Sequence, residues 1–436
     1  MKIIHTADLH LGQVIYQNYD RCDEHQHFFR QLEQWCQAEQ PDALLVSGDV
    51  FDIQQPSATV KKAFTEYFVR LHRVCPKMAI VITAGNHDSA SRIQADNAVW
   101  QLANAYLIGT PPAFNCLDTP DGTPADEPHR SLWQYQYIVK LASGYVVALP
   151  YMTGERKQAI QSILDKVAED NILGLPVVVM AHQAVTGVDV TGHDFEIGKL
   201  KTQETSSFGV GFDYLALGHI HKPQTIGHQE DCMEPVVDYH APVVRYSGSA
   251  LHVSCDENYP HTVSLVEIEG HKGKVSIRQL RIDELRHFFV LPLDGSSFTS
   301  AEEAIEAMSQ FVSEAERGYI RFRFDYRANL PANFSQMVYD ALQPYNDEWR
   351  YNPKMLWTGQ DESRQQEKEQ LVFEVAELQQ MTDPMQFVER TKDQYPGLDI
   401  EDVRQAFEEV KAEMLLLSEE RLRVGTQRSG MKENKI

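Results

Sequence analysis

The 436-residue chain carries 40 lysines and arginines against 63 aspartates and glutamates, a formal net charge of −23. That balance argues against a protein that holds nucleic acid through a broad basic surface, and the 42% of hydrophobic residues excludes wholesale disorder. The length exceeds that of one typical domain and predicts two or three. No apolar run approaches the roughly 18–20 residues of a membrane-spanning helix and no Cys-x-x-Cys pair occurs, so we expect a cytoplasmic protein with reduced cysteines.

Residues 1–285 alternate short β-branched runs with helical patterns, which predicts a layered α/β domain. Strands are expected at Lys2–Thr6, Ala43–Ser47, Met78–Thr83, Tyr145–Leu149, Val177–Ala181 and Tyr214–Leu217. Helical patterns cover Phe28–Gln40 and Ala58–Val74. A proline-rich stretch at 110–129 interrupts the alternation and is typical of a surface excursion.

Residues 286–360 have a different rhythm and are predicted to form a small α+β domain. A strand is expected at His287–Leu293, followed by a helix that begins near Thr299. Tyr319–Tyr326 alternates apolar and polar side chains, as a strand with one buried face requires. A further helix and a strand at Trp349–Trp357 complete the unit.

Residues 361–420 are helical in pattern and acidic, with 17 acidic against 6 basic side chains. Apolar side chains repeat there in a narrow stripe, at Val403, Phe407, Val410, Met414 and Leu417. Such a stripe packs either on its own domain or in the groove of a partner, and the spacing alone favours neither. The basic residues 421–436 are predicted to be a disordered tail.

Five apolar strand patterns each end in a polar cluster that could bind metal. The clusters hold Asp8 and His10, Asp49 and Asp52, Asn86 and His87, His182, and finally His219 and His221. One such cluster would be an ordinary turn, but five in this order are hard to assign to chance. Because sites in open α/β sheets lie beyond the carboxyl ends of the strands, we expect these side chains to meet.

The ligand types in these clusters indicate a pair of divalent ions. Carboxylates, an amide and neutral imidazoles suit Mn²⁺ better than they suit a thiolate zinc site. The candidate ligands are Asp8, His10, Asp49, Asn86, His182, His219 and His221. They exceed what one ion needs when positions must stay open for a substrate, so the count predicts two ions bridged by a carboxylate.

The pattern Asp-x-His, Gly-Asp-x-x-Asp, Gly-Asn-His-Asp, His and Gly-His-x-His resembles that of the dimetal calcineurin-like phosphoesterases. Segments 5–12, 48–52, 84–89, 216–221 and 246–249, with Asp256-Glu257 after them, are similar to those of the SbcD family, the nuclease subunits of bacterial SbcCD complexes. The resemblance implies a layered β-sandwich/α core, a small α+β capping domain at 286–360, and a helical segment at 361–420 that docks on the SbcC ATPase. That placement favours the partner interpretation of the stripe.

The resemblance also implies roles for the clustered residues. Asp8, His10 and His221 would bind one manganese ion, Asp49 would bridge, and Asn86, His182 and His219 would complete the second ion. His87 resembles the catalytic histidine that assists the leaving oxygen or steadies the phosphate. Asp52 is implied to orient His87, and a simple turn residue is the alternative. Three residues after the first motif would contact the DNA backbone or lie in a polar rim loop, namely Tyr16, Tyr19 and Arg21.

The implied function is that of a manganese-dependent DNA nuclease, a double-strand exonuclease and a single-strand or hairpin endonuclease. It would act with SbcC in DNA repair, recombination and replication, as a homodimer within a heterotetramer that is nucleoid-associated when bound to DNA. Two divalent ions bring about four positive charges to the phosphate, so the acidic balance does not exclude DNA if the partner supplies most of the grip.

Other functions on the same core are open to different degrees. A broad-specificity metallophosphodiesterase that acts on small phosphoesters is the alternative. A serine/threonine phosphatase is disfavoured because Ile53-Gln54 follows Asp52 and Asp88 follows His87. A non-enzymatic subunit with a vestigial site is disfavoured because none of the expected ligands is missing.

Overall fold

The computed structural model describes residues 1–16, 19–112, 133–154, 156–191, 201–228, 236–253, 257, 259–314, 317–345 and 348–359. Two compact units divide the chain, one of residues 1–324 and 328–356, the other of residues 325–327 and 357–436. Most of the proline-rich stretch, the apolar stripe at 403–417 and the basic tail lie outside the described residues.

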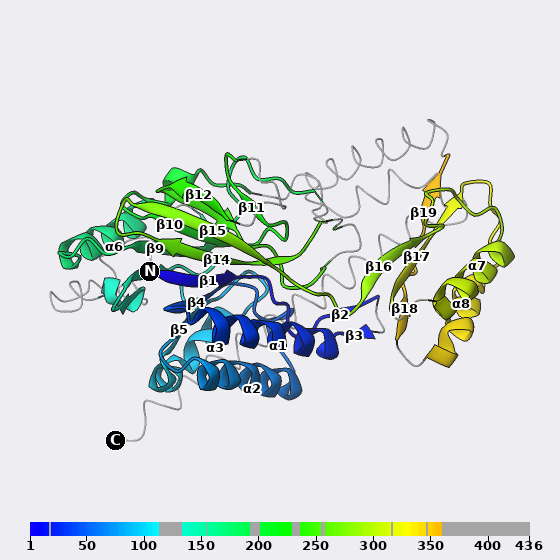
Figure 1. Ribbon diagram of the computed structural model, residues 1–436, viewed down its shortest axis with the longest axis horizontal. Coiled ribbons are helices and arrows are strands. Elements are labelled where there is room, and N and C mark those ends of the chain that lie inside the picture. The colour runs from blue at the N-terminus through cyan, green and yellow to red at the C-terminus, as the bar shows by residue number, and fades with distance from the viewer. Residues whose placement is uncertain are drawn as a thin grey trace, which may run out of the picture. The chain divides into compact units, whose positions relative to one another are not determined.

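Two β-sheets form the framework of residues 1–285 (Figure 1). The seven-stranded sheet has the order β12 (Val237–His240), β15 (Lys274–Arg281), β14 (Thr262–Ile268), β1 (Lys2–Thr6), β4 (Ala43–Ser47), β5 (Ala79–Thr83) and β6 (Ala105–Ile108). The six-stranded sheet has the order β11 (Gln224–Thr225), β13 (Val243–Tyr246), β10 (Tyr214–Gly218), β9 (Val177–His182), β8 (Gly144–Ala148) and β7 (Ile138–Leu141). The predicted strands are therefore confirmed to within a residue or two at their ends.

Alternating side chains place the central strands between two apolar layers. Ile3 and Leu45 belong to a core shared with Val179 and Leu215 of the other sheet, so the two sheets pack face to face. Their neighbours in sequence, such as Ile4, belong to the second core, which also contains aromatic side chains of helices. This arrangement confirms the layered β-sandwich/α fold.

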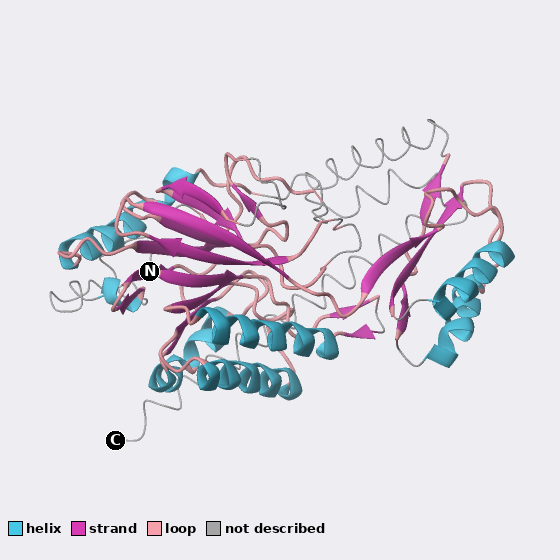
Figure 2. Cartoon of the chain, viewed as in Figure 1, coloured by secondary structure: helices cyan, strands magenta, loops and turns pink. Residues whose placement is uncertain are grey.

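Helices cover the outer faces of the sandwich (Figure 2). In Figure 1, α1 (Cys22–Glu39) and α2 (Ala58–Val74) run side by side along the seven-stranded sheet, and the two helices are in contact. The remaining elements here are β2 (Val14–Ile15), β3 (Tyr19–Asp20), α3 (Ala90–Ala95), α4 (Asn97–Trp100) and α6 (Lys157–Asp170). Helix α1 begins six residues before the predicted Phe28, because its first turns bury the polar Glu24 and His25 and so lack an apolar pattern.

Residues 286–360 build a separate α+β arrangement with its own apolar core. Its elements are β16 (His287–Leu291), α7 (Ala301–Glu314), β17 (Gly318–Asp325), α8 (Phe334–Leu342), β18 (Trp349–Tyr351) and β19 (Leu356–Thr358). Strands β16, β17 and β18 pair in parallel in that order. The single strand expected at Trp349–Trp357 is two strands, because Pro353 lies between β18 and β19 and cannot donate a ladder hydrogen bond.

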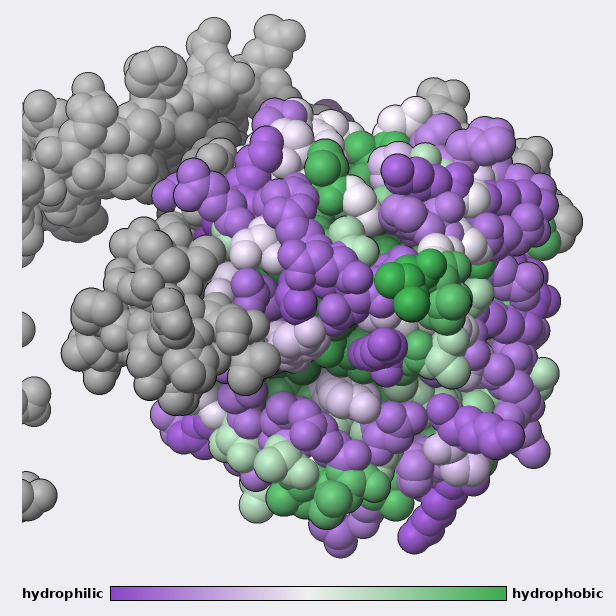
Figure 3. Space-filling model, turned by 90° about the vertical axis from the view of Figure 1, so that its left-hand side faces the viewer, coloured by the Kyte–Doolittle hydropathy of each residue, from purple (hydrophilic) through white to green (hydrophobic). Residues whose placement is uncertain are grey.

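The surface of the described chain is mainly hydrophilic on the face that Figure 3 shows, with apolar side chains in separate patches. Most large apolar side chains are instead buried in the cores described above. Among the described residues, no helix combines the length and the apolar character needed to cross a bilayer.

Candidate metal centre

The carboxyl ends of β1, β4 and β5 in one sheet and of β9 and β10 in the other meet at one edge of the sandwich. Strands β1, β4 and β5 are parallel neighbours, and so are β9 and β10. The Ser47 hydroxyl at the end of β4 donates to the carbonyl of Ala216 in β10, at 3.1 Å, which joins the two sheets at this edge. Every site residue predicted from the sequence follows or ends one of these five strands.

Two groups of side chains form at this edge, and each could hold an ion. Asp8, His10 and His221 bring ligand atoms within 4.8 Å of one another, and so do Asp49, His182 and His219. The Asn86 carbonyl oxygen joins the second group, at 3.0 Å from His182 Nε2 and 2.9 Å from His219 Nδ1. These are the two sets that the sequence resemblance implies, and their role as ligands stays a prediction.

Asp49 lies between the two groups, where a bridging carboxylate would have to be. Its Oδ2 atom is 3.3 Å from His182 Nε2 in one group and 3.9 Å from His10 Nε2 in the other. Its Oδ1 atom accepts a hydrogen bond from the backbone N–H of His87 at 2.9 Å. One carboxylate therefore faces both groups and also fixes the loop after β5.

The backbone at these residues is strained. Asp8, His10, Asp49 and His219 have φ angles of 52°, 46°, 46° and 94°, in the left-handed region that side chains other than glycine rarely adopt. Such a conformation costs on the order of 1–3 kcal/mol per residue and persists only where its surroundings over-determine it. Here the His10 N–H donates to the Asp49 carbonyl at 3.0 Å, and the Asp8 N–H donates to the Gly48 carbonyl at 3.1 Å. The loops are thus held in one conformation before any ligand binds.

Two glycines allow the loops to approach this closely. A Cβ atom on Gly85 would lie 2.0 Å from Asp49 Oδ1 and 2.2 Å from the Asp49 backbone nitrogen. A Cβ atom on Gly48 would lie 2.2 Å from His182 Nδ1, and Gly48 also has a φ of +83°. Neither position can take a side chain without moving a predicted ligand.

Hydrogen bonds on the far side of the imidazoles orient the buried histidines. His182 Nδ1 donates to the Ser47 carbonyl at 2.8 Å, and His221 Nδ1 lies 2.9 Å from Glu257 Oε1. With Nδ1 engaged in this way, each ring presents Nε2 to the centre, which is the usual arrangement of a metal-binding histidine. Glu257 belongs to one of the family-like sequence segments, but no role was predicted for it.

The site is unusually rich in buried charge. Burial alone would lower the pKa of His182, but Asp49 and Asp8 raise it to about 9. Burial raises the pKa of Asp8, whereas at Asp49 the same burial is outweighed by His182, His10 and His87, which hold its pKa well below the usual range. Backbone N–H groups of His219 and His87 donate to Asp8 and Asp49, and nearby positive charge, which protonated imidazoles or cations can supply, stabilises these two buried carboxylates further.

His87 is exposed at the mouth of the centre, where it forms a third group with His10 and Asp52. Its Nδ1 donates to the backbone carbonyl of Asp52 at 2.9 Å, while the Asp52 carboxylate lies 3.3 Å from His10 Nδ1. Asp52 therefore contacts His87 as the resemblance implies, but through its backbone carbonyl, while its carboxylate pairs with His10, and a role in orienting His87 stays a prediction. The Asp52 carboxylate still offers an oxygen within 4.8 Å of ring nitrogens of His10 and His87.

Asp88 organises the two ligand loops, although no role was predicted for it. One carboxylate oxygen accepts from the N–H groups of Val50 and Gly85 at 3.0 and 2.8 Å, and the other accepts from Phe51 at 2.9 Å. Burial, followed by the charge of Asp49, raises its pKa to about 6. The sequence did offer a signal for Asp88, because it is an acidic residue directly after the Gly-Asn-His motif that was not assigned as a metal ligand.

Arg21 does not lie where the sequence predicted. Contact with a DNA backbone and a place in a polar rim loop both require exposure, yet Arg21 is only 2% exposed. Its guanidinium is bound by Glu24, at 3.0 and 2.6 Å, and by Gln13 at 2.8 Å. Both interpretations are wrong, because a buried carboxylate holds the side chain inside the protein.

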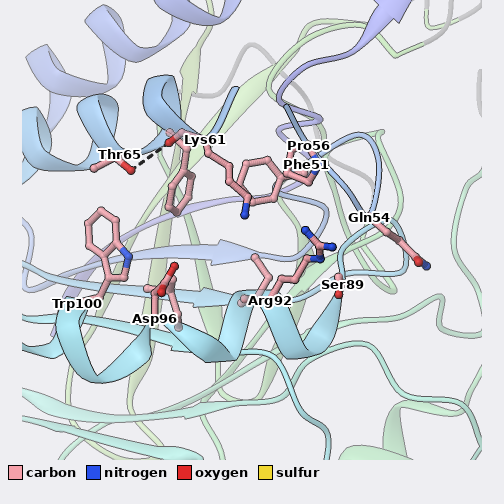
Figure 4. A pocket seen from close by; sticks show the side chains of 12 residues that line it. Phe51, Gln54, Pro56, Lys61, Thr65, Ser89, Arg92, Asp96 and Trp100 are labelled. Atoms are coloured by element: carbon pink, nitrogen blue, oxygen red, sulfur yellow. Dashed lines mark hydrogen bonds between the residues drawn. The ribbon is translucent and has the colours of Figure 1, made fainter. Parts of the chain in front are cut away.

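A pocket flanks the metal centre without containing any predicted ligand (Figure 4). Phe51 and Ser89, which follow ligand loops, form part of its wall. Lys61 of α2 and Arg92 of α3 extend their charged ends into it (Figure 4). The candidate chemistry therefore remains at the strand ends and not in this pocket.

Comparisons with known proteins agree with this geometry. Residues 1–223 match the calcineurin-like phosphoesterase family. The chain is 30% identical to SbcD of the nuclease SbcCD from Rhodobacter capsulatus, over 62% of this chain and 67% of that protein. It is 29% identical to SbcD of Escherichia coli K12, over 71% and 75% of the two chains, and 27% identical to SbcD of Bacillus subtilis 168, over 61% and 66%.

Proposed function

Because the chain belongs to the SbcD family of calcineurin-like phosphoesterases, and is therefore a metal-dependent phosphodiester hydrolase of the nuclease type, we propose that it cleaves DNA with two Mn²⁺ ions. The observation that carries the proposal is the meeting of two ligand groups around Asp49 at one edge of the sandwich. The activities we propose are those of a double-strand exonuclease and a single-strand or hairpin endonuclease.

The residues at this edge suit a pair of hard to borderline cations. We assign Asp8, His10 and His221 to one ion, Asp49 to a bridging position, and Asn86, His182 and His219 to the second ion. The Nε2 atom of the buried His10 has no hydrogen-bond partner among the described residues, as expected of an atom that awaits a ligand, while its Nδ1 atom lies 3.3 Å from the Asp52 carboxylate. Bound divalent cations would supply Lewis acidity and neutralise charge on the scissile phosphate.

His87 is the side chain placed to move a proton. It is exposed beside the ligand groups, and its Nδ1–H is held by the Asp52 carbonyl. When the ring is protonated, Nε2–H points away from that bond and can donate to a leaving oxygen or to a phosphate oxygen. We assign Asp52 two positioning contacts, from its carbonyl to His87 and from its carboxylate to His10.

The relatives are named as SbcD components of the nuclease SbcCD, and we propose a similar assembly for this chain. Residues 361–420, which are outside the described residues, would dock on the SbcC ATPase, and two copies of this chain would pair within a heterotetramer. Residues 286–360 would act as a capping domain over the core at 1–285, which their separate apolar core supports. Such a complex would act in DNA repair, recombination and replication in the cytoplasm, at the nucleoid.

Cleavage of three substrates tests the proposal. The full chain is incubated with a DNA hairpin, a linear duplex and bis-p-nitrophenyl phosphate, each with Mn²⁺ or with Mg²⁺. We expect Mn²⁺-dependent cleavage of DNA, and a loss on the order of 10²–10⁴-fold in His87→Ala because general acid catalysis contributes about that much. Cleavage of the small ester without any cleavage of DNA would favour a broad-specificity phosphodiesterase, and full activity in His87→Ala would refute the assignment of that residue.

A further inference from the structure

A buried cluster of charges lies away from the metal ligands, and the reaction described above does not use it. The Glu24 cluster consists of Arg21, Glu24, Arg286, Tyr319 and Arg350, and none of these residues is more than 7% exposed. A buried carboxylate surrounded by arginines is costly to assemble, because each charge must leave water. Its members come from distant parts of the sequence, which makes it a candidate junction between elements.

On one side, Glu24 is bound to the strands of residues 286–360. Its Oε1 atom accepts from the Tyr319 hydroxyl of β17 at 2.5 Å and from Arg350 Nη1 of β18 at 2.9 Å. Arg286, directly before β16, lies 3.6 Å from the same oxygen. Tyr319 and Arg350 also bond to each other at 2.7 Å, so the three strands present a joint set of donors to one carboxylate oxygen.

On the other side, the same carboxylate holds the loop that carries two predicted metal ligands. Glu24 Oε2 accepts from Arg21, which donates to Gln13 Oε1 at 2.8 Å, and the Gln13 N–H donates to the carbonyl of His10 at 3.0 Å. One residue further along α1, His25 Nε2 donates to the carbonyl of Leu9 at 2.8 Å. The first turn of α1 thus fixes the backbone on which Asp8 and His10 stand.

The two oxygens of Glu24 therefore bind different parts of the protein. Oε1 accepts from residues of β17 and β18, and Oε2 accepts from Arg21, which is linked to the ligand loop. Asp23 also faces the cluster, at 2.7 Å from Arg286 and 3.6 Å from Arg350, but its side chain is 44% exposed and water screens its charge more than that of Glu24. Glu24 is thus a buried contact between two parts of the protein whose relative position matters for a large substrate.

We propose that Glu24 is a positioning residue that fixes strands β16–β18 against the loop of Asp8 and His10, and that this junction favours DNA over small phosphodiesters. The inference rests on the proposed function. Residues 286–360 contribute none of the predicted ligands, so they influence the reaction through how a substrate lies at the centre. A small phosphodiester needs only the ligands and His87, whereas a DNA strand extends past them and is misplaced when the junction loosens.

The test compares two substrates in three variants of the full chain. Glu24→Gln replaces one acceptor by a donor that faces arginine. Tyr319→Phe removes the hydroxyl that donates to Glu24 and accepts from Arg350, and leaves the bond from Arg350 to Glu24 in place. Glu33→Gln is the matched control, because Glu33 lies on the same helix and accepts from Arg70 of α2 at 2.7 Å, apart from the cluster. Each variant is assayed for kcat/KM with a DNA hairpin and with bis-p-nitrophenyl phosphate at saturating Mn²⁺, and its unfolding temperature is recorded.

We expect Glu24→Gln and Tyr319→Phe to lower kcat/KM for the hairpin on the order of tenfold, and for the small ester by less than about threefold. Glu33→Gln should leave the ratio of the two values unchanged. A parallel fall for both substrates, or an unchanged ratio in a folded Tyr319→Phe variant, would overturn the inference. If Glu24→Gln does not fold, Tyr319→Phe decides, and an inactive unmodified chain would refute the proposed function rather than this inference.

Discussion

Glu257 should control the affinity of the centre for metal, although it is not a predicted ligand. The carboxylate is 1% exposed, and its Oε1 atom lies 2.9 Å from His221 Nδ1. Its other oxygen accepts from the Val253 N–H at 3.1 Å and lies 3.3 Å from His261 Nε2. Glu257→Gln keeps the shape of the side chain but removes its charge and one acceptor.

The amide of the substituted side chain cannot accept from both His221 Nδ1–H and the Val253 N–H, because it has only one oxygen. If its oxygen faces His221, its NH₂ group meets the Val253 N–H, and if the amide is flipped, its NH₂ group meets His221 Nδ1–H. A buried donor that loses its acceptor costs about 1–3 kcal/mol. Loss of the partner behind a metal-binding histidine typically costs 10–100-fold in metal affinity, or about 1.4–2.7 kcal/mol.

The assay is the Mn²⁺ concentration that gives half-maximal hydrolysis of bis-p-nitrophenyl phosphate, supported by direct calorimetric titration of Mn²⁺. We expect this concentration to rise on the order of tenfold in Glu257→Gln, with little change in the rate at saturating Mn²⁺. Glu267→Gln is the control, since that carboxylate on β14 is 57% exposed. An unchanged Mn²⁺ dependence in a folded Glu257→Gln variant would show that His221 is not oriented for metal by this residue.

Three further outcomes follow from the structure. Gly85→Ala should abolish hydrolysis, because its Cβ atom would lie 2.0 Å from Asp49 Oδ1, and retained activity would contradict the close packing of the two loops. Asp52→Asn should raise the Mn²⁺ requirement, because the Asp52 carboxylate lies 3.3 Å from Nδ1 of the predicted ligand His10, and an unchanged Mn²⁺ dependence would contradict that contact. Burial and then Arg21 lower the pKa of His25 to about 4, below its unfolded value of about 6.5, so the unfolded state gains a proton first and stability is lost as pH falls from about 6.5 toward 4. At pH 5 this loss is about 2 kcal/mol, and urea unfolding of His25→Gln should show a correspondingly smaller decrease between pH 7 and pH 5.

Local sequence patterns were sufficient to predict a layered α/β domain and the set of clustered side chains, whereas the sandwich was expected only from the family resemblance. Buried strands such as Ala43–Ser47 appear as continuous apolar runs, and the polar residues that follow them must emerge at the carboxyl ends of the strands. Because parallel neighbours share that end, the meeting of Asp8, Asp49 and Asn86 follows from these patterns alone. The position of these three side chains can therefore be predicted from where each strand ends.

The surroundings of these side chains depend instead on long-range packing. Glu24 and Tyr319 are 295 residues apart in sequence, and no periodicity relates them, so the burial of Arg21 could not be predicted. The same holds for Glu257 behind His221 and for the carbonyl of Asp52 beside His87, which depend on how loops fold onto one another. A local pattern specifies which way a side chain points from its own strand, whereas its hydrogen-bond partner is set by the tertiary contacts that bring distant loops together.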